Sequence, residues 1–187
     1  MPRMILLPVM IVFMLQLFAG SAAAQQGEEK FLMPKVPGYV TGFIDRTSKM
    51  LMIELVPEGQ TVDAWTDMIT FQIFRQRADL KPEAYEKRLV TLWTDRCPGS
   101  EYLPITNSVE NGYPSSFFFL YCPLNPQTNQ PEATFFKTFQ GRDAFYSAQK
   151  AFKSKPDKAQ VAEWDEFFRK VAVCDSRLTD HACPDPE

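Results

Sequence analysis

The spacing of apolar residues changes repeatedly from Tyr39 onward, and this feature limits the possible folds more than any other. Segments with an apolar residue at every second position, typical of strands, alternate with segments whose spacing of about 3.6 is typical of helices. Turn residues stand at the changes, and the chain has no internal repeat. We therefore predict one α+β domain over residues 39–175, a twisted antiparallel sheet of about six or seven strands with about two or three packed helices.

The clearest strand signals lie in the middle of the chain. Asn111-Gly112 is a residue pair that two-residue hairpin turns prefer, and it separates two apolar segments. The second of these, Ser115 to Tyr121, contains an unbroken apolar run, which predicts a central strand covered on both faces. The other predicted strands are residues 40–44 and 50–55, which form a hairpin, 69–73, 133–139, and 144–152, which also fits a helix.

Two segments have the periodicity of amphipathic helices. The first begins at Pro82, a residue favoured in the first helical turn, and its pattern predicts that Glu86, Lys87 and Arg88 stay in water. The second follows Pro156-Asp157. Thr61 is a candidate N-cap for a short helical turn over residues 62–65. The two apolar stripes consist of Tyr85, Leu89, Leu92 and Trp93, and of Val161, Trp164, Phe167, Phe168 and Val171.

The N-terminus has the three parts of a secretory signal peptide. Arg3 is positively charged, Met4 to Phe18 are apolar apart from Pro8 and Gln16, and small residues end at Ala24. We expect residues 1–24 to be removed and the protein to be periplasmic or secreted. A membrane anchor is the alternative, but an apolar run of about 15 residues is short for a span that needs about 20. We expect no transmembrane segment after cleavage, and an extended lead-in over residues 25–38.

The four cysteines all lie in the mature chain, and an even number in an exported protein favours disulfides over free thiols. Three pairings are possible. The favoured one joins Cys97 to Cys122, a helix end to a strand, and Cys174 to Cys183, which holds the polar tail 176–187. The alternative is a metal site, because His181, the only histidine, lies near Cys174 and Cys183, but this spacing fits no standard zinc pattern. We predict no metal and no cofactor.

Charge and motifs argue against several classes of function. Loss of Arg3 with the signal leaves 19 basic against 23 acidic residues, a net charge of −4, whereas a generic nucleic-acid binder is basic. The chain has no G-x-S-x-G, H-E-x-x-H, P-loop or G-x-G-x-x-G motif, and only 8 glycines. A hydrolase with a histidine base is disfavoured because the one histidine lies in the tail. We therefore expect no nucleic-acid partner and no nucleotide chemistry.

Carboxylates leave one enzymatic alternative, a hydrolase with two facing acids. Asp63 and Asp67 stand four residues apart, and Asp165 and Glu166 lie on the last predicted helix. Acidic residues at such positions more often form a solvated helix face or complement the helix dipole. The carboxylate pair is therefore the runner-up interpretation, and we predict no catalytic residue.

Aromatic and basic residues leave further binding alternatives. The tryptophans could form a sugar-stacking platform, the lysines before the last helix could contact anionic lipid, and the phenylalanines could line a pocket for an apolar ligand. Core packing is favoured for the aromatic residues and a solvated loop for the lysines. The residues are Trp65, Trp93 and Trp164; Lys150, Lys153, Lys155 and Lys158; and Phe117, Phe118, Phe119, Phe135, Phe136 and Phe139.

Two stretches of the chain resemble known proteins. Val56 to Thr70 and Gly141 to Tyr146, the latter followed by Trp164 and Val173-Cys174-Asp175, resemble uncharacterised exported proteins of Gram-negative bacteria. This resemblance spans residues 50 to 175 and implies no activity, because that family has no agreed one. The predicted order of strands and helices also resembles a PsbP-type sandwich, an antiparallel sheet with helices on its faces.

The sequence favours a non-catalytic exported binding or interaction domain, with an unknown protein or a small apolar ligand as its partner. The alternatives are a periplasmic hydrolase with a carboxylate pair and an envelope-associated structural accessory protein. A binding module predicts an exposed apolar patch or an apolar cavity. The hydrolase instead predicts two carboxyl groups about 5 to 9 Å apart across a cleft.

Overall fold

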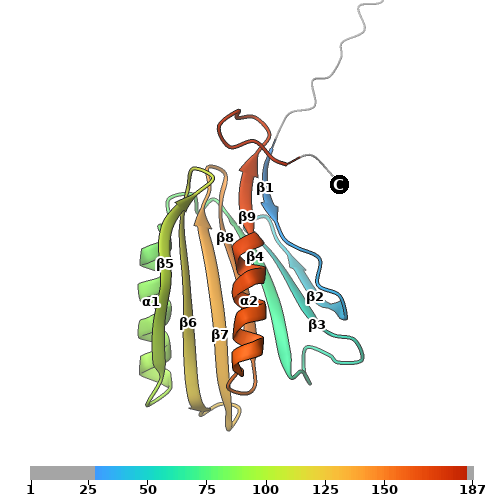
Figure 1. Cartoon of the computed structure of the whole chain (residues 1–187), viewed down its shortest axis with the longest axis vertical. Helices are drawn as coiled ribbons and strands as arrows, with labels where there is room; N and C mark the ends of the chain where they lie inside the picture. Colours follow the sequence, from blue (N-terminus) through green and yellow to red (C-terminus); the bar gives the residue numbers. More distant parts are fainter. Residues whose placement is uncertain (1–27, 185–187) are drawn as a thin grey trace, which may run out of the picture.

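The computed structural model describes residues 28–184, so the predicted signal peptide and its cleavage site lie outside the described part. It contains a seven-stranded and a two-stranded antiparallel sheet with two helices (Figure 1). The helices are α1 (Pro82–Arg96) and α2 (Lys158–Lys170). The strands are β1 (Glu29–Leu32), β2 (Tyr39–Arg46), β3 (Met50–Pro57), β4 (Asp67–Arg75), β5 (Glu101–Glu110), β6 (Tyr113–Asn125), β7 (Gln130–Gln140), β8 (Ala144–Phe152) and β9 (Ala172–Asp175).

The large sheet has the order β2-β3-β4-β8-β7-β6-β5, and every neighbouring pair is antiparallel. Strands adjacent in sequence form hairpins, except where β4 pairs with β8 and joins the two halves of the sheet. The small sheet pairs β1 with β9 and so brings the two ends of the described chain together. The α+β class, with a single sheet-and-helix domain, is confirmed.

The two faces of the large sheet carry different layers. Because side chains alternate along a strand, Phe117 and Phe118 point to opposite faces of β6. The Phe117 ring lies 5.3 Å from that of Phe168 on α2, whereas the Phe118 ring stacks 5.0 Å from that of Phe136 beneath α1. Figure 1 shows α2 in front of the sheet and α1 behind it. The apolar run in β6 is therefore covered on both faces, as predicted.

Asn111 and Gly112 form the predicted tight turn between β5 and β6. Both have positive φ angles, 47° and 78°, as a two-residue hairpin turn of this kind requires. Gly112 also lies directly against the His181 imidazole, because a Cβ built on it would approach that ring to 1.8 Å. The Asn111 amide donates a 2.9 Å hydrogen bond to the carbonyl of Val173. The turn is thus held beneath the C-terminal tail.

Several local predictions need correction or extension. Residues 62–65 are not helical: they belong to a turn closed by a bridge between Thr61 and Ala64. The ambiguous segment 144–152 is the strand β8. Strands β1 and β9 were not predicted, because four residues are too few to show a period. Part of the extended lead-in is therefore a strand, β1, which pairs with β9.

Candidate functional site

A cleft of about 510 Å³ opens between the end of α1 and the turn that joins β6 to β7. This volume lies within the range of small-molecule sites. One wall is apolar and comes from α1, whose side chains also pack on the core beneath it. The opposite side is polar and comes from the β6–β7 turn and β7. The lining residues are Leu89, Leu92, Trp93 and Arg96 of α1, the bridged Cys97 and Cys122, and Asn125, Pro126, Gln127 and Glu132.

The Cys97–Cys122 disulfide positions the two sides of the cleft. Cys97 is the C-cap of α1 and Cys122 lies in β6, and their Cα atoms are 5.9 Å apart. Trp93, one turn before this C-cap, places its ring edge-on to Phe136, 6.3 Å away. The bridge therefore fixes the end of α1 over β6, as the sequence predicted. The second disulfide, Cys174–Cys183, also has the predicted pairing.

The polar side of the cleft is held by its own hydrogen bonds. The Asn125 side chain accepts a 2.9 Å hydrogen bond from the backbone amide of Gln127. Its amide group donates a 2.6 Å hydrogen bond to one carboxylate oxygen of Glu132. This turn is short because Asn129 adopts a positive φ of 54° and donates its backbone N–H to the Asn125 carbonyl. Glu132 is therefore presented at the cleft by a preformed turn.

Two opposite charges in the cleft have no counter-ion within residues 28–184. No carboxylate lies within 4.0 Å of the Arg96 guanidinium, and no cationic group lies within 4.0 Å of the Glu132 carboxylate. Arg96 is exposed in the last turn of α1, and Glu132 is half-buried on β7. The cleft thus combines an apolar wall with one cation and one anion that are free to pair with a ligand.

The candidate carboxylates do not form a facing pair. Asp67 lies at the start of β4 and pairs with Lys150, whereas Asp63 is exposed in the turn between β3 and β4. On α2, Asp165 pairs with Arg169 at 2.8 Å and Glu166 with Lys170 at 2.7 Å, both at i,i+4 spacing on the surface. The α2 acids therefore belong to a solvated helix face, the interpretation that the sequence favoured.

Lys150 is buried, which corrects the prediction that it lies in a solvated loop. Its side chain has no exposed surface, and its ammonium donates hydrogen bonds to Asp67 and to the Tyr39 hydroxyl. The ammonium also lies 4.1 Å from the centre of the Trp164 ring and 5.0 Å from that of Phe152. Cation–π contacts of this kind offset part of the cost of burying the charge. This burial was not predicted, because Lys150 belongs to a run of lysines that resembles a solvated segment.

Burial and hydrogen bonding oppose each other in this cluster. Burial lowers the pKa of Lys150 to about 8, despite the opposing effect of Asp67. Partial burial alone would raise the pKa of Asp67, but hydrogen bonds from Lys150 and Tyr39 outweigh it and lower that pKa. Burial, reinforced by the hydrogen bond to Asp67, raises the pKa of Tyr39. The cluster is closed by its own partners and therefore acts as a structural element.

Lys150 makes stability depend on pH in the alkaline range. Its pKa falls from 10.5 to about 8 on folding, so between these values the unfolded chain binds more protons and stability rises with pH. We expect the difference in unfolding free energy between the wild type and Lys150→Met to shift in favour of the wild type from pH 8 to pH 10, as measured by urea denaturation. Because both proteins share all other titratable groups, most of the pH dependence that those groups cause cancels in this difference. A difference that is constant from pH 7 to pH 10 would contradict the lowered pKa.

Lys153, Lys155 and Lys158 remain at the surface, half-buried or exposed, and the three tryptophans do not form one stacking platform, because Trp164 is buried. Lys153 lies over the Trp65 ring at 4.3 Å, and Lys155 lies over the Tyr121 ring at 4.6 Å. Trp164 is buried, as the core interpretation predicted. Trp65 and Trp93 are only partly buried, and Trp93 lines the cleft. The phenylalanines are divided between the two faces of the sheet and belong to the packed core.

Glu86 is buried on α1, which contradicts the prediction that it stays in water. The residue is 5% exposed, and its carboxylate accepts hydrogen bonds from the hydroxyls of Tyr102 and Ser116. Burial, together with the hydrogen bond to Glu86, raises the pKa of Tyr102 to about 12. Lys87 and Arg88 are exposed, as predicted. Glu86 differs because hydroxyls on β5 and β6 donate hydrogen bonds to it, and the periodicity of α1 does not record them.

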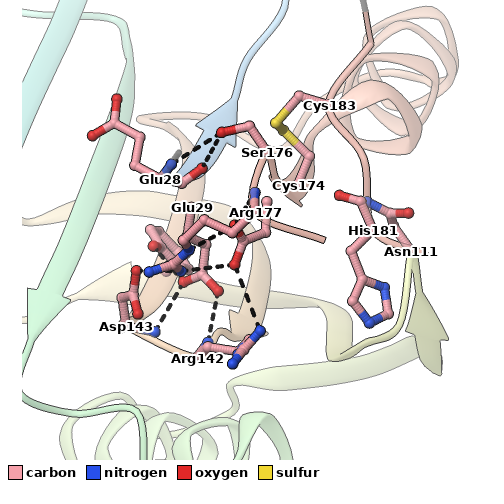
Figure 2. Close-up of polar contacts among 12 residues, drawn as sticks. Glu28, Glu29, Asn111, Arg142, Asp143, Cys174, Ser176, Arg177, His181 and Cys183 are labelled. Carbon is pink, nitrogen blue, oxygen red and sulfur yellow. Dashed lines mark hydrogen bonds and ion pairs between the residues drawn. A yellow bond between two sulfur atoms is a disulfide. The ribbon is translucent and has the colours of Figure 1, made fainter. Parts of the chain in front are cut away.

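A second polar cluster connects β1, the turn between β7 and β8, and the end of β9, and is shown in Figure 2. Asp175 is fully buried and accepts hydrogen bonds from the Arg177 guanidinium, which hold its pKa well below the usual value, at about 2. Glu29 of β1 accepts hydrogen bonds from the Tyr146 hydroxyl, at 2.6 Å, and from the backbone amides of Arg142 and Asp143. These carboxylates are occupied by donors from this chain, so the cluster is a structural clamp.

His181 belongs to the same region. Its ring lies 5.3 Å from that of Tyr113, and its carbonyl accepts a hydrogen bond from the backbone of Asp175. Cys174 and Cys183 are joined in a disulfide and provide no thiolates. Within residues 28–184, no group of three or more His, Cys, Asp or Glu side chains is placed to hold a metal ion. Neither described helix is long and apolar enough to cross a membrane.

Sequence reasoning missed the cleft. Arg96, Asn125 and Glu132 were not candidates, because an isolated arginine, asparagine and glutamate give no motif. The one available signal was the predicted Cys97–Cys122 bridge, which places the end of α1 beside β6.

The fold and the cleft define a disulfide-linked α+β domain with an open amphipathic cleft. The two disulfides indicate an oxidising, exported environment.

Comparisons with known proteins add little to this description. No family model matches the chain, and no curated protein matches it. A solved structure of a mutant of the protein Mog1 matches with a TM-score of 0.46 and 14% identity, covering 77% of this chain and 95% of that one. The Ran-binding protein Mog1p of Saccharomyces cerevisiae matches with the same TM-score and identity, covering 79% and 95%. Similarity this low supports no inference about the function of the chain.

Proposed function

We propose that this chain is an exported binding domain without catalytic activity, and that it holds its ligand in the cleft between α1 and the β6–β7 turn. The main support for this proposal is the cleft itself, which has the volume of a small-molecule site, an apolar wall and preformed polar groups. Sites of this composition bind by burying apolar ligand surface, while a few polar groups set the orientation. We also propose that the signal peptide directs the chain to the periplasm or the medium.

Two observations favour binding over the hydrolase alternative. Asp67 is engaged by Lys150 and Tyr39, and the acids of α2 are paired on the surface with basic residues of their own helix. Among residues 28–184, Glu132 contributes the one carboxylate that lines the cleft, whereas the hydrolase mechanism needs two. The proposed resemblance to a PsbP-type sandwich is supported by the two helices, which pack on opposite faces of the sheet.

Binding in the cleft can be tested with N-phenyl-1-naphthylamine, a neutral apolar probe whose emission rises in apolar sites. We expect a saturable rise with the wild-type protein. Leu92→Gln replaces part of the apolar wall by an amide and should weaken binding at least about tenfold, because a buried leucine contributes about 1.5–3 kcal/mol.

Val161→Gln is the matched control, because Val161 is an apolar residue of α2 with 38% exposure and does not line the cleft. It should leave probe binding unchanged, and thermal melting should show both variants to be folded. A rise that does not saturate, or equal weakening by both variants, would contradict the proposed site.

A further inference from the structure

The cleft contains a charge pattern that goes beyond apolar binding. Arg96 is the last residue of α1 and Glu132 lies on β7, so the two residues come from opposite sides of the cleft. Cys122 is the register partner of Glu132, and Cys97 directly follows Arg96. The Cys97–Cys122 bridge therefore joins the residue after Arg96 to the register partner of Glu132. Both charged residues line the cleft, yet no ion pair joins them within 4.0 Å.

Both charged groups have free capacity for hydrogen bonds. No hydrogen bond is formed by the Arg96 guanidinium with residues 28–184, and a guanidinium has five N–H donors suited to a carboxylate. Glu132 receives the Asn125 amide on Oε2, which leaves Oε1 available for a second donor. Asn125 also fixes the orientation of this carboxylate. The cleft thus offers a guanidinium to an anionic group and a carboxylate held by Asn125 to a cationic one.

We infer that the cleft binds a short apolar zwitterion, namely an apolar amino acid or short peptide with free amino and carboxyl ends. The ligand carboxylate would pair with Arg96, its ammonium with Glu132, and its apolar side chains would pack on Leu92 and Trp93. An internal segment of a protein carries neither terminal charge and would leave both groups unpaired. This inference rests on the proposed function and specifies its ligand class.

Four forms of one dipeptide separate the contributions of the two charges. The probes are phenylalanyl-phenylalanine, its N-acetyl form, its C-terminal amide, and the form blocked at both ends. We expect the zwitterion to bind wild-type protein about two- to fivefold more tightly than either singly blocked form, as calorimetry measures, because each block removes one ion pair. Arg96→Gln should remove the preference for the free carboxylate alone, and Glu132→Gln the preference for the free amine alone.

The matched controls remove one positive and one negative charge from α1 outside the cleft. Arg88→Gln and Glu83→Gln alter exposed residues outside the cleft and should leave all four affinities unchanged. Equal affinity for all four forms would overturn the zwitterion inference and leave the proposed binding function standing. The inference would also be overturned if none of the four binds while N-phenyl-1-naphthylamine still does. If neither the dipeptides nor that probe binds, the proposed function fails as well.

Discussion

Replacing Asp67 by asparagine should lower the free energy of unfolding by about 3–5 kcal/mol at pH 7, because it leaves a buried ammonium without its counter-ion. Lys150 has no exposed surface, so water cannot replace the lost carboxylate. The nearby aromatic rings and the Tyr39 hydroxyl remain, but they carry no full negative charge. For a domain of this size the change corresponds to a loss on the order of 10 °C in Tm. Urea denaturation and thermal melting measure both quantities.

Removing the other partner of the ion pair provides the control. Lys150→Met keeps a long side chain among the rings and removes the buried charge. It leaves Asp67, which is 20% exposed and retains hydrogen bonds from Tyr39 and Thr66. We expect Lys150→Met to cost less than Asp67→Asn, and to restore stability when added to Asp67→Asn. If the double variant is as unstable as Asp67→Asn alone, the loss does not come from an unpaired Lys150.

The sequence predicted the main elements because their patterns are long. The alternation of apolar and polar residues in β4 and the Asn111-Gly112 turn come from local geometry that neighbouring residues impose. The unbroken apolar run of β6 also indicated correctly that both faces of the sheet are covered. Short β1 and β9 could not be predicted, because each depends on a partner at the other end of the chain.

Charged residues were the least predictable, because their burial depends on groups distant in sequence. Glu86 is buried because hydroxyls of Tyr102 and Ser116 reach it, and Lys150 because Asp67 and Tyr39 do. The separations range from 16 to 111 residues, and no local pattern records them. The cleft has the same origin, since its charged residues meet through the packing of α1 on the sheet. Only the Cys97–Cys122 pairing connected its two sides in advance.

Removing the Cys97–Cys122 bridge should lower stability more than removing the Cys174–Cys183 bridge. On the chain-entropy account, bridges that close separations of 25 and 9 residues contribute about 3.5 and about 2.6 kcal/mol. We expect Cys97→Ala with Cys122→Ala to lower Tm by on the order of 10 °C in oxidising buffer. The difference from the wild type should largely vanish when a reductant opens the native bridges, which thermal melting with and without dithiothreitol measures.

The same double variant should also weaken ligand binding, because the bridge lines the cleft and fixes the end of α1 over β6. Cys174→Ala with Cys183→Ala is the matched control, since it removes a bridge that holds the tail and does not line the cleft. At a temperature where both variants remain folded, N-phenyl-1-naphthylamine should bind the control as it binds the wild type. It should bind the Cys97→Ala, Cys122→Ala variant several-fold more weakly. Equal binding by the two variants would mean that α1 keeps its position through the packing of Leu89, Val90 and Trp93 alone.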